Sequence, residues 1–255
     1  MARITVFANQ KGGVSKSTTT HALSAGLIER GFRVLAIDMD PQANLTHTMQ
    51  ANINGTGLYE ALNGEPVSEL IQNTPHGQIL ASSHQLIRAD KKFSDVGSEY
   101  LLADALAPVK NNYDYILIDT PPQLGILTVG ALVASNDVII PITADIYAME
   151  GLSQLASNIE KIKRRPNPGL RVGGILMTRY SGRSVLSRDL KTAIENQAVE
   201  MGMPVYKTII REGVSVREAQ TQYMSIFSYA PASNQAKDYD NFIGEYLNEG
   251  GGING

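Results

Sequence analysis

The sequence predicts an α/β fold with a doubly wound, mainly parallel sheet flanked by helices. Short runs rich in β-branched residues recur along the chain and alternate with segments of helical spacing. These runs are almost continuously apolar, as expected where helices cover both faces of a parallel sheet. A chain of 255 residues, 43% of them hydrophobic, can bury one sizeable core. We therefore expect a single domain over residues 1–248 and a flexible, glycine-rich tail over 249–255.

Six strands and six helices are predicted in alternating order. The strands are expected at 4–8, 34–37, 115–118, 138–142, 174–177 and 205–210. The helices are expected at 17–30, where Gly31 ends the helix, and then at 100–109, 124–134, 150–164, 185–201 and 234–247. The polar segment 52–93 is expected to hold short elements and loops.

Composition excludes several classes of protein. The chain has no cysteine, which rules out disulfides, iron–sulfur ligation, thiolate zinc sites and cysteine nucleophiles. The four histidines have no metal-ligand spacing. No apolar run approaches the roughly 18 residues that suggest a membrane span, and the N-terminus leads directly into a strand-like run without a secretion signal. We expect a soluble, cytoplasmic protein.

Charge is distributed unevenly along the chain. Residues 161–217 contain twelve Lys/Arg and four Asp/Glu, a net of +8, which leaves −11 for the remainder of a chain whose formal charge is −3. A basic surface on an acidic protein can attract a polyanion if its residues share one face. Several solvated helix faces that point in different directions are the alternative.

A glycine-rich segment follows the first predicted strand and opens the first predicted helix. Such a turn lets backbone N–H groups surround a phosphate, while Lys16 neutralises the β/γ oxygens and the Ser17 hydroxyl ligates Mg²⁺. The usual pattern G-x-x-x-x-G-K-[ST] fails at Gln10 and Ser15, where it has glycine. A turn that merely joins strand to helix is the alternative. The expected phosphate-binding residues are Gly12, Gly13, Val14, Ser15, Lys16, Ser17 and Thr18.

Aspartates follow two further predicted strands. Asp38 and Asp40 end the second strand in Asp-Met-Asp-Pro-Gln, and Asp119 follows the strand 115–118. Because the carboxyl ends of parallel strands line one ligand crevice, all three carboxylates can approach a Mg²⁺-nucleotide. Each aspartate alone could belong to an ordinary turn after a strand. Their order along the chain after the glycine loop makes a nucleotide site the better interpretation.

The paired lysines point to a particular family. Lys11 lies five residues before Lys16, and Gly12-Gly13-Val14 lies between them. With the aspartates that follow, this segment resembles the ParA/MinD family of deviant-Walker P-loop ATPases. The resemblance covers nearly the whole chain and is closest to short Soj-like ParA partition proteins without an N-terminal helix-turn-helix domain. Further segments similar to that subgroup are 57–62, 98–102, 147–152 and 210–219.

The resemblance implies ATP and Mg²⁺ as cofactors and an ATP-sandwiched homodimer. Lys11 would then reach the nucleotide of the other subunit, Asp40 would position the attacking water, and Lys16 would act in its own subunit. Ser17, Asp38 and Asp119 would support the magnesium shell. Three further residues, Thr178, Pro231 and Ser233, would lie near the adenine, although a strand end and a helix cap explain them equally well.

The family resemblance also implies two macromolecular partners. One is a ParB-like centromere-binding protein that stimulates hydrolysis, and the other is duplex DNA, which would place the protein on the nucleoid. No base-reading motif accompanies the basic residues, so DNA binding should be independent of sequence. The candidate DNA contacts, with Arg183 and Arg211 first, also include Lys161, Lys163, Arg164, Arg165, Arg188, Lys191 and Arg217.

One residue departs from the family pattern in the loop itself. Ser15 occupies a position where the family has glycine. If the backbone there has positive φ, serine adds strain on the order of 1 kcal/mol. Slower hydrolysis or weaker ATP affinity would follow.

Two other functions are compatible with the same nucleotide site. A MinD-like ATPase would act at a membrane through a basic amphipathic C-terminal helix, but 234–249 contains a single base, Lys237, beside four acids. A metabolic ATP-dependent ligase or a positioner of another cargo would keep the loop and lack ATP-dependent DNA retention. The absence of cysteine excludes a nitrogenase-reductase-like protein with a bridging cluster.

Overall fold

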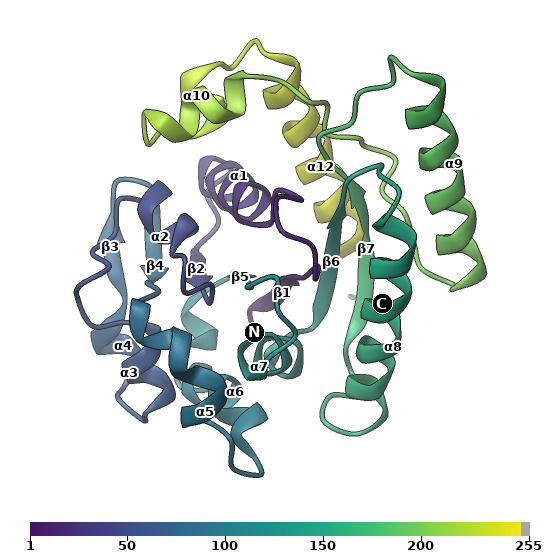
Figure 1. Cartoon of the computed structure of the whole chain (residues 1–255). Coiled ribbons are helices and arrows are strands. Elements are labelled where there is room, and N and C mark those ends of the chain that lie inside the picture. Colours follow the sequence, from purple (N-terminus) through teal and green to yellow (C-terminus); the bar gives the residue numbers. More distant parts are fainter. Residues whose placement is uncertain (251–255) are drawn as a thin grey trace.

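A seven-stranded sheet forms the centre of the computed structural model, which describes residues 1–250 and their side chains to residue 248. The strand order is β3-β4-β2-β5-β1-β6-β7, and only β3 runs antiparallel to its neighbour (Figure 1). The predicted doubly wound, mainly parallel sheet is therefore confirmed. The strands are β1 (Arg3–Phe7), β2 (Val34–Asp38), β3 (Gln72–Thr74), β4 (Gly77–Leu80), β5 (Tyr115–Asp119), β6 (Asp137–Ile142) and β7 (Arg171–Met177).

Helices cover both faces of the sheet. Side chains from α1, α10, α11 and α12 share one buried apolar cluster with one face, and side chains from α6, α7, α8 and α9 share the larger cluster with the other. The helices are α1 (Lys16–Glu29), α2 (Asn44–Thr48), α3 (Leu58–Leu62), α4 (Val67–Leu70), α5 (Ala89–Lys92), α6 (Leu101–Leu106), α7 (Ile126–Ala134), α8 (Ala148–Arg164), α9 (Val185–Glu200), α10 (Ser215–Thr221), α11 (Ile226–Tyr229) and α12 (Asn234–Gly250). Short 3₁₀ turns lie at His84–Arg88, Ser98–Tyr100 and Lys110–Asn112.

The predicted strand 205–210 is wrong. The segment runs beside β7 and makes separate hydrogen bonds, with Tyr206 N–H to the Ile175 carbonyl (3.0 Å) and Ile210 N–H to the Met177 carbonyl (2.9 Å). Only a single bridge, between Ile175 and Val205, joins it to the sheet. The run is apolar because the Tyr206 and Ile210 side chains are buried under α12, not because it forms a ladder.

Short elements account for the other differences. The hairpin β3–β4 lies in the segment that we expected to hold loops and short elements, and α10 and α11 were not predicted. Helices of seven and four residues are too short to show a 3.6-residue period clearly. The domain boundary at 248 remains a prediction, since α12 continues to Gly250 and the tail from 251 onward lies outside the described residues.

The sheet register brings the predicted site residues to one edge. Asp38 at the end of β2 is paired with Asp119 at the end of β5, and Phe7 at the end of β1 is paired with Asp119 on its other side. The three loops that follow these strands therefore start side by side. The loop after β1 then enters α1, which lies across the same face as α12 (Figure 1).

A buried histidine lies on the helix that begins at the glycine loop. The His21 side chain packs edge-on against His76, with 5.5 Å between ring centroids, and its Nε2 has no hydrogen-bond partner among the described residues. Burial lowers the pKa of His21 to about 4, and the neighbouring His76 acts in the same direction. The folded protein therefore keeps this imidazole neutral at a pH where the unfolded chain protonates it.

We expect His21 to reduce stability as the pH falls from about 6.5 toward 4. In that window the unfolded state binds more protons than the folded state, so the free energy of unfolding decreases with falling pH. Between pH 7.5 and pH 5, the titration of His21 lowers the free energy of unfolding by about 2 kcal/mol. Urea unfolding of wild type and His21→Gln at both pH values isolates the contribution of His21, because the two proteins have all other titrating groups in common. Exposed His84→Gln is the control, and an equal pH loss in wild type and His21→Gln would contradict the prediction.

Candidate functional site

The loop between β1 and α1 lines a cavity. Gly13 and Ser15 both adopt the left-handed conformation, with φ of 74° and 66°. Ser15 caps α1 without a side-chain hydrogen bond, and the first turn of the helix has no acidic residue. The N–H groups of this turn and the positive end of the helix dipole therefore face the same space. This arrangement suits a phosphate group.

Lys16 provides a buried cation in this turn. Its side chain is 8% exposed, and its Nζ donates hydrogen bonds to the carbonyls of Asn9 (3.2 Å) and Lys11 (3.3 Å). Burial lowers the pKa of Lys16, while the carboxylates of Asp119 and Asp40 oppose that shift. The ammonium is thus held close to the loop backbone and near two carboxylates.

Asp119 is the most unusual group in the site. Its side chain is fully buried, and neither carboxylate oxygen has a hydrogen-bond partner among the described residues. Burial and the nearby Asp38 raise the pKa of Asp119 well above its usual value. The Lys16 ammonium and the Ser17 hydroxyl act in the opposite direction, although the hydroxyl does not have the geometry of a hydrogen bond. Buried carboxylate oxygens normally have partners. A cation bound beside them would supply the missing partner.

These residues fit a magnesium ion that is shared with phosphate oxygens. Within the described part of the chain, no three His, Cys, Asp or Glu side chains could hold a metal ion by themselves. Mg²⁺ is usually bound through one or two protein oxygens together with substrate phosphates and water. Asp119 and Ser17 would hold it here.

Asp38 and Asp40 have different environments. The Asp38 carboxylate accepts hydrogen bonds from the Asp40 N–H (3.0 Å), the Thr46 N–H (2.8 Å) and the Thr46 hydroxyl (2.7 Å). Burial raises the pKa of Asp38 to about 6, and the Thr46 hydrogen bonds oppose the rise. Asp38 therefore organises the turn that carries Asp40. Asp40 lines the cavity itself, and its carboxylate accepts a hydrogen bond from the Gln42 N–H at 2.9 Å.

Lys11 extends from the loop to the protein surface. Its Nζ forms an ion pair with Asp145, which follows β6. Asp145 also accepts hydrogen bonds from the Thr143 hydroxyl (2.5 Å) and the Tyr147 N–H (3.1 Å). Burial alone would raise the pKa of Asp145, but the hydrogen bonds from Lys11 and Thr143 outweigh it and the pKa is lowered. The next two residues, Ile146 and Tyr147, are 61% and 67% exposed, so an apolar surface lies beside the Lys11 ion pair.

Two adjoining cavities lie on either side of the loop. The first, of about 510 Å³, contains Lys16, Ser17 and Asp40 and extends to Pro122 and Tyr223. The second, of about 390 Å³, lies between the loop and α10 and does not include Lys16. Both cavities are lined by Gly13, Ser15, Thr18 and Gln220. Together they can take an elongated ligand with its most anionic end at Lys16.

The expected adenine contacts are not in either cavity. The Thr178 hydroxyl is buried and donates toward the carbonyls of Val14 (3.0 Å) and Ile142 (3.2 Å), so it supports the loop. Ser233 accepts a hydrogen bond from the Ala236 N–H at 3.1 Å and thus caps α12, which is the alternative role that we gave for this residue. Pro231 is exposed and lines neither cavity. A direct adenine contact by these three residues therefore has no support in the geometry.

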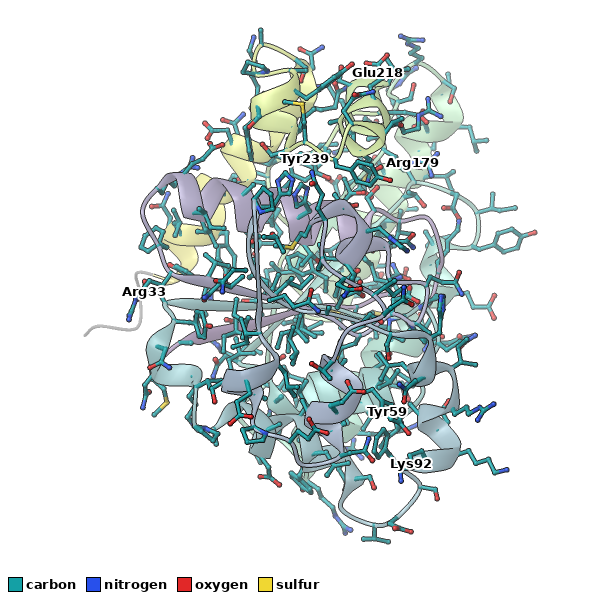
Figure 2. All side chains as sticks on the ribbon, turned by 90° about the vertical axis from the view of Figure 1, so that its left-hand side faces the viewer. Arg33, Tyr59, Lys92, Arg179, Glu218 and Tyr239 are labelled. Atoms are coloured by element: carbon teal, nitrogen blue, oxygen red, sulfur yellow. The ribbon has the colours of Figure 1, made fainter. Side chains whose placement is uncertain are left out.

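Other residues, not predicted, line the second cavity. Arg179 has a left-handed backbone (φ 50°), and its guanidinium donates to the Gly13 carbonyl at 3.0 Å. Gln220 of α10 donates to the Thr18 hydroxyl at 2.9 Å. Figure 2 shows Arg179 and Tyr239, which line this cavity, in the space between α1 and α10. No sequence motif marks these residues, because their proximity to the loop depends on the tertiary fold.

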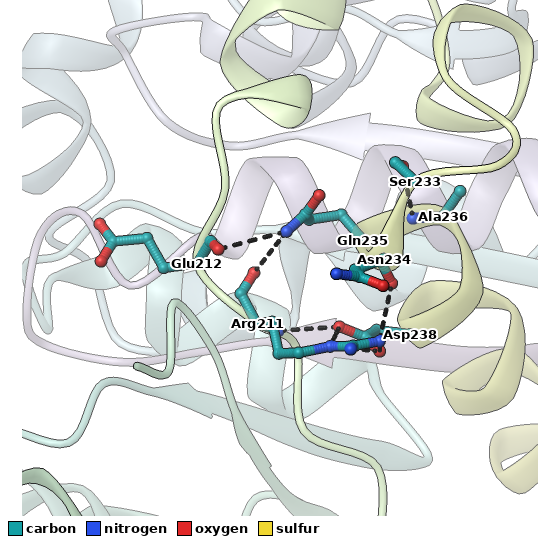
Figure 3. Close-up of polar contacts among 7 residues, drawn as sticks. All are labelled: Arg211, Glu212, Ser233, Asn234, Gln235, Ala236 and Asp238. Atoms are coloured by element: carbon teal, nitrogen blue, oxygen red, sulfur yellow. Dashed lines mark hydrogen bonds and ion pairs between the residues drawn. The ribbon is translucent and has the colours of Figure 1, made fainter. Parts of the chain in front are cut away.

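Arg211 is held by a buried acid. Its guanidinium forms two-pronged hydrogen bonds with Asp238, including Nη2 to Oδ1 at 2.6 Å, and its backbone N–H donates to the same carboxylate (Figure 3). Gln235 donates to the carbonyl of Glu212 (3.2 Å) in the same group. The charge of Arg211 is therefore neutralised within the protein. Its predicted role as a leading DNA contact loses support, since a neutralised guanidinium attracts phosphate weakly.

The remaining basic candidates lie in separate places. Residues 161–165 are at the C-terminal end of α8, which returns to the edge where the strands begin, whereas Arg183 and Arg188 lie beyond the opposite ends of the strands. Lys163 is paired with Glu160, and Lys191 is paired with Glu195. Arg183 lines an open groove of about 600 Å³ beside Arg211 and has no ion-pair partner among the described residues. Arg183 therefore keeps its place as a leading candidate.

Ser15→Gly is expected to stabilise the protein. Serine at φ 66° carries steric strain that glycine does not, and the larger conformational entropy of glycine in the unfolded chain offsets part of the gain. We expect a net increase of about 0.5–1 kcal/mol in the free energy of unfolding. Thermal unfolding measures it as a rise of about 2 °C in Tm. Ser24→Gly, within the regular part of α1, should lower Tm instead, and a lower Tm for Ser15→Gly would show that the serine makes an unrecognised contact.

A phosphate-binding loop after β1, an aspartate at the end of β5 and a mainly parallel sheet define a P-loop nucleoside triphosphatase. A family model described as an AAA domain matches residues 2–172. Chromosome partitioning protein ParA of Myxococcus xanthus is 37% identical over 94% of this chain and 86% of its own length. Chromosome-partitioning ATPase Soj of Thermus thermophilus is 35% identical over 94% and 93%. The chain therefore belongs to the ParA/Soj branch of the ParA/MinD family of P-loop ATPases.

A solved structure of an enzyme with a bound nucleotide shares this fold. The structure of cobyrinic acid a,c-diamide synthase from Mycobacterium smegmatis with a bound ATP analogue and magnesium is 31% identical. It covers 98% of this chain and 96% of its own, with a TM-score of 0.86.

Among the described residues, no helix combines the length and the apolar character needed to cross a bilayer.

Proposed function

We propose that this protein is a DNA-partition ATPase that binds ATP and Mg²⁺, dimerises around the nucleotide and holds duplex DNA without regard to sequence. The observation that carries the proposal is a phosphate loop with two lysines in different environments. Lys16 is buried inside its own site, whereas Lys11 reaches the surface beside exposed apolar residues. The relatives named as chromosome-partition proteins support DNA as the cargo.

Hydrolysis of the γ-phosphate requires alignment and charge more than covalent chemistry. The loop N–H groups would hold the phosphates, and Lys16 would neutralise charge at the β/γ oxygens. Ser17 and Asp119 would hold Mg²⁺, which supplies further positive charge to those oxygens when bound. Asp40 lines the same cavity and has a carboxylate oxygen available to orient the attacking water, while Asp38 keeps the Asp40 turn in place.

The dimer would form where Lys11 reaches the surface. Within one subunit Lys11 is paired with Asp145, so its ammonium is oriented and already near the outer face of the loop. The γ-phosphate of a second subunit would offer a stronger anionic partner. Ile146 and Tyr147 would then be covered by that subunit, which makes the exposed apolar surface part of the interface. ATP thereby becomes part of the contact between subunits.

The DNA surface would be built around Arg183. This residue has no acidic partner among the described residues and lies at the open groove near the start of α9, where Arg188 follows. A dimer presents two copies of this surface, so DNA affinity should rise with ATP and fall steeply with salt. We further propose that a ParB-like protein stimulates hydrolysis and that the ATP-bound dimer is located on the nucleoid.

Retention of an arbitrary duplex with and without ATP tests this function. Wild type should sediment with DNA only when ATP and Mg²⁺ are present. Arg183→Ala should weaken retention about tenfold with nucleotide binding intact, whereas Lys163→Ala, whose lysine is paired at the far end of α8, should behave as wild type. Arg211→Ala should chiefly lower Tm, since it leaves Asp238 buried and unpaired. Retention that does not depend on ATP would contradict the proposal.

A further inference from the structure

One arginine in the cavity beside the loop has no acidic partner. This cavity, between the loop and α10, contains three guanidinium groups. Arg179 is paired with Glu212 (3.5 Å), and Arg211 is paired with Asp238 (2.6 Å). Within residues 1–248, the guanidinium of Arg217 makes no hydrogen bond or ion pair. Arg217 therefore provides the uncompensated positive charge of the cavity.

The orientation of α10 directs Arg217 toward the loop. Gln220, one turn later on the same helix, donates to the Thr18 hydroxyl at 2.9 Å. Residues three apart lie on the same face of a helix, and Arg217, Gln220 and Val216 all line the cavity. Arg217 thus faces the space next to Gly13, Ser15 and Thr18.

The cavity determines which part of a nucleotide lies there. Lys16 and Asp40 line only the neighbouring cavity, which would take the β- and γ-phosphates. The cavity with Arg217 would take the other end, which consists of the α-phosphate, the ribose and the base. The α-phosphate is the anionic group of that end, and a guanidinium binds phosphate oxygens with two parallel hydrogen bonds.

We propose that Arg217 is a nucleotide-binding residue that pairs with the α-phosphate in its own subunit, and is not a DNA contact. This inference rests on the proposed function, because it assumes that the loop binds a nucleotide. Since ATP and ADP share the α-phosphate, Arg217 strengthens the binding of both to the same extent. It therefore helps to retain nucleotide after hydrolysis and does not distinguish substrate from product.

Equilibrium titration with fluorescent ATP and ADP analogues tests the assignment. Arg217→Ala should lose about tenfold in affinity for each nucleotide, and Arg217→Lys should recover part of the loss. Arg88→Ala, which removes an exposed arginine that lines neither cavity, is the matched control and should bind both nucleotides as wild type does. At saturating ATP, Arg217→Ala should retain DNA with the same salt dependence as wild type, since no phosphate contact to DNA is removed. Thermal unfolding of each variant establishes that the comparison is made between folded proteins.

Three results would overturn the assignment. Unchanged nucleotide affinity together with weakened DNA retention at saturating ATP would make Arg217 a DNA contact. A loss confined to ATP would place the guanidinium at the γ-phosphate. Wild-type affinity of Arg217→Ala for both nucleotides and for DNA would show that the guanidinium binds neither ligand. If Lys16→Ala also bound nucleotide normally, the proposed function itself would fail, so the two failures are distinguishable.

Discussion

Lys16→Ala is expected to reduce ATP affinity by about 100-fold or more, which corresponds to roughly 2.8 kcal/mol. Lys16 is the buried cation of the phosphate loop, and it lies near the carboxylates of Asp119 and Asp40. Without it, the triphosphate would enter a site whose nearest ionisable groups are acidic. Because the cost combines a lost attraction with a new repulsion, it should be among the largest of any single change.

Titration with a fluorescent ATP analogue measures the effect directly. Lys163→Ala serves as the control, since it removes a lysine that is paired with Glu160 on the surface. Lys16→Ala should also fail to sediment with DNA in the presence of ATP. Affinity within a few-fold of wild type would mean that Lys16 has only a structural role, in which its Nζ supports the loop through the carbonyls of Asn9 and Lys11.

Lys11→Ala is expected to separate nucleotide binding from dimerisation. Lys11 is paired with Asp145 at the surface, outside the buried part of its own site, so affinity for ATP in the monomer should remain within about threefold. The ATP-dependent dimer should be lost, because the second subunit no longer contributes a cation to the γ-phosphate. Sedimentation velocity with ATP, performed in parallel with nucleotide titration, measures both quantities.

Asp145→Asn provides the complementary variant. It keeps the shape of the side chain while removing the charge that holds Lys11 in its own subunit. It should lower the ATP concentration needed for dimerisation, whereas the double variant with Lys11→Ala should remain monomeric. A Lys11→Ala protein that dimerises with ATP as wild type does would show that Lys11 is not part of the subunit contact.

Much of the site was predictable because it follows local rules. The loop around Lys16 is contiguous in sequence, and Asp38 and Asp119 each end a strand of otherwise apolar residues. A parallel sheet brings such positions to one edge, and the observed pairing of Asp38 with Asp119 agrees. Ser15 has positive φ, which is the condition under which we expected strain at this position, where the family pattern has glycine.

What could not be predicted depends on contacts between distant segments. The apolar run 205–210 has the composition of a strand, yet its buried side chains serve the packing under α12. Thr178 ends a strand next to the site, but its hydroxyl supports the loop at Val14. Arg211 has the charge of a DNA contact, and only the fold reveals that Asp238 neutralises it. Sequence shows which groups are present, whereas tertiary structure determines which of them are already paired.

Sedimentation of the Asp40→Ala protein with a short duplex tests the central claim most directly. Asp40 lines the phosphate cavity, so its removal should block hydrolysis while leaving ATP bound. We predict that this variant sediments as a dimer on DNA when ATP and Mg²⁺ are present, remains there longer than wild type, and stays monomeric and unbound without ATP. A protein that stays monomeric with ATP, or that binds the duplex equally well without it, would contradict the account.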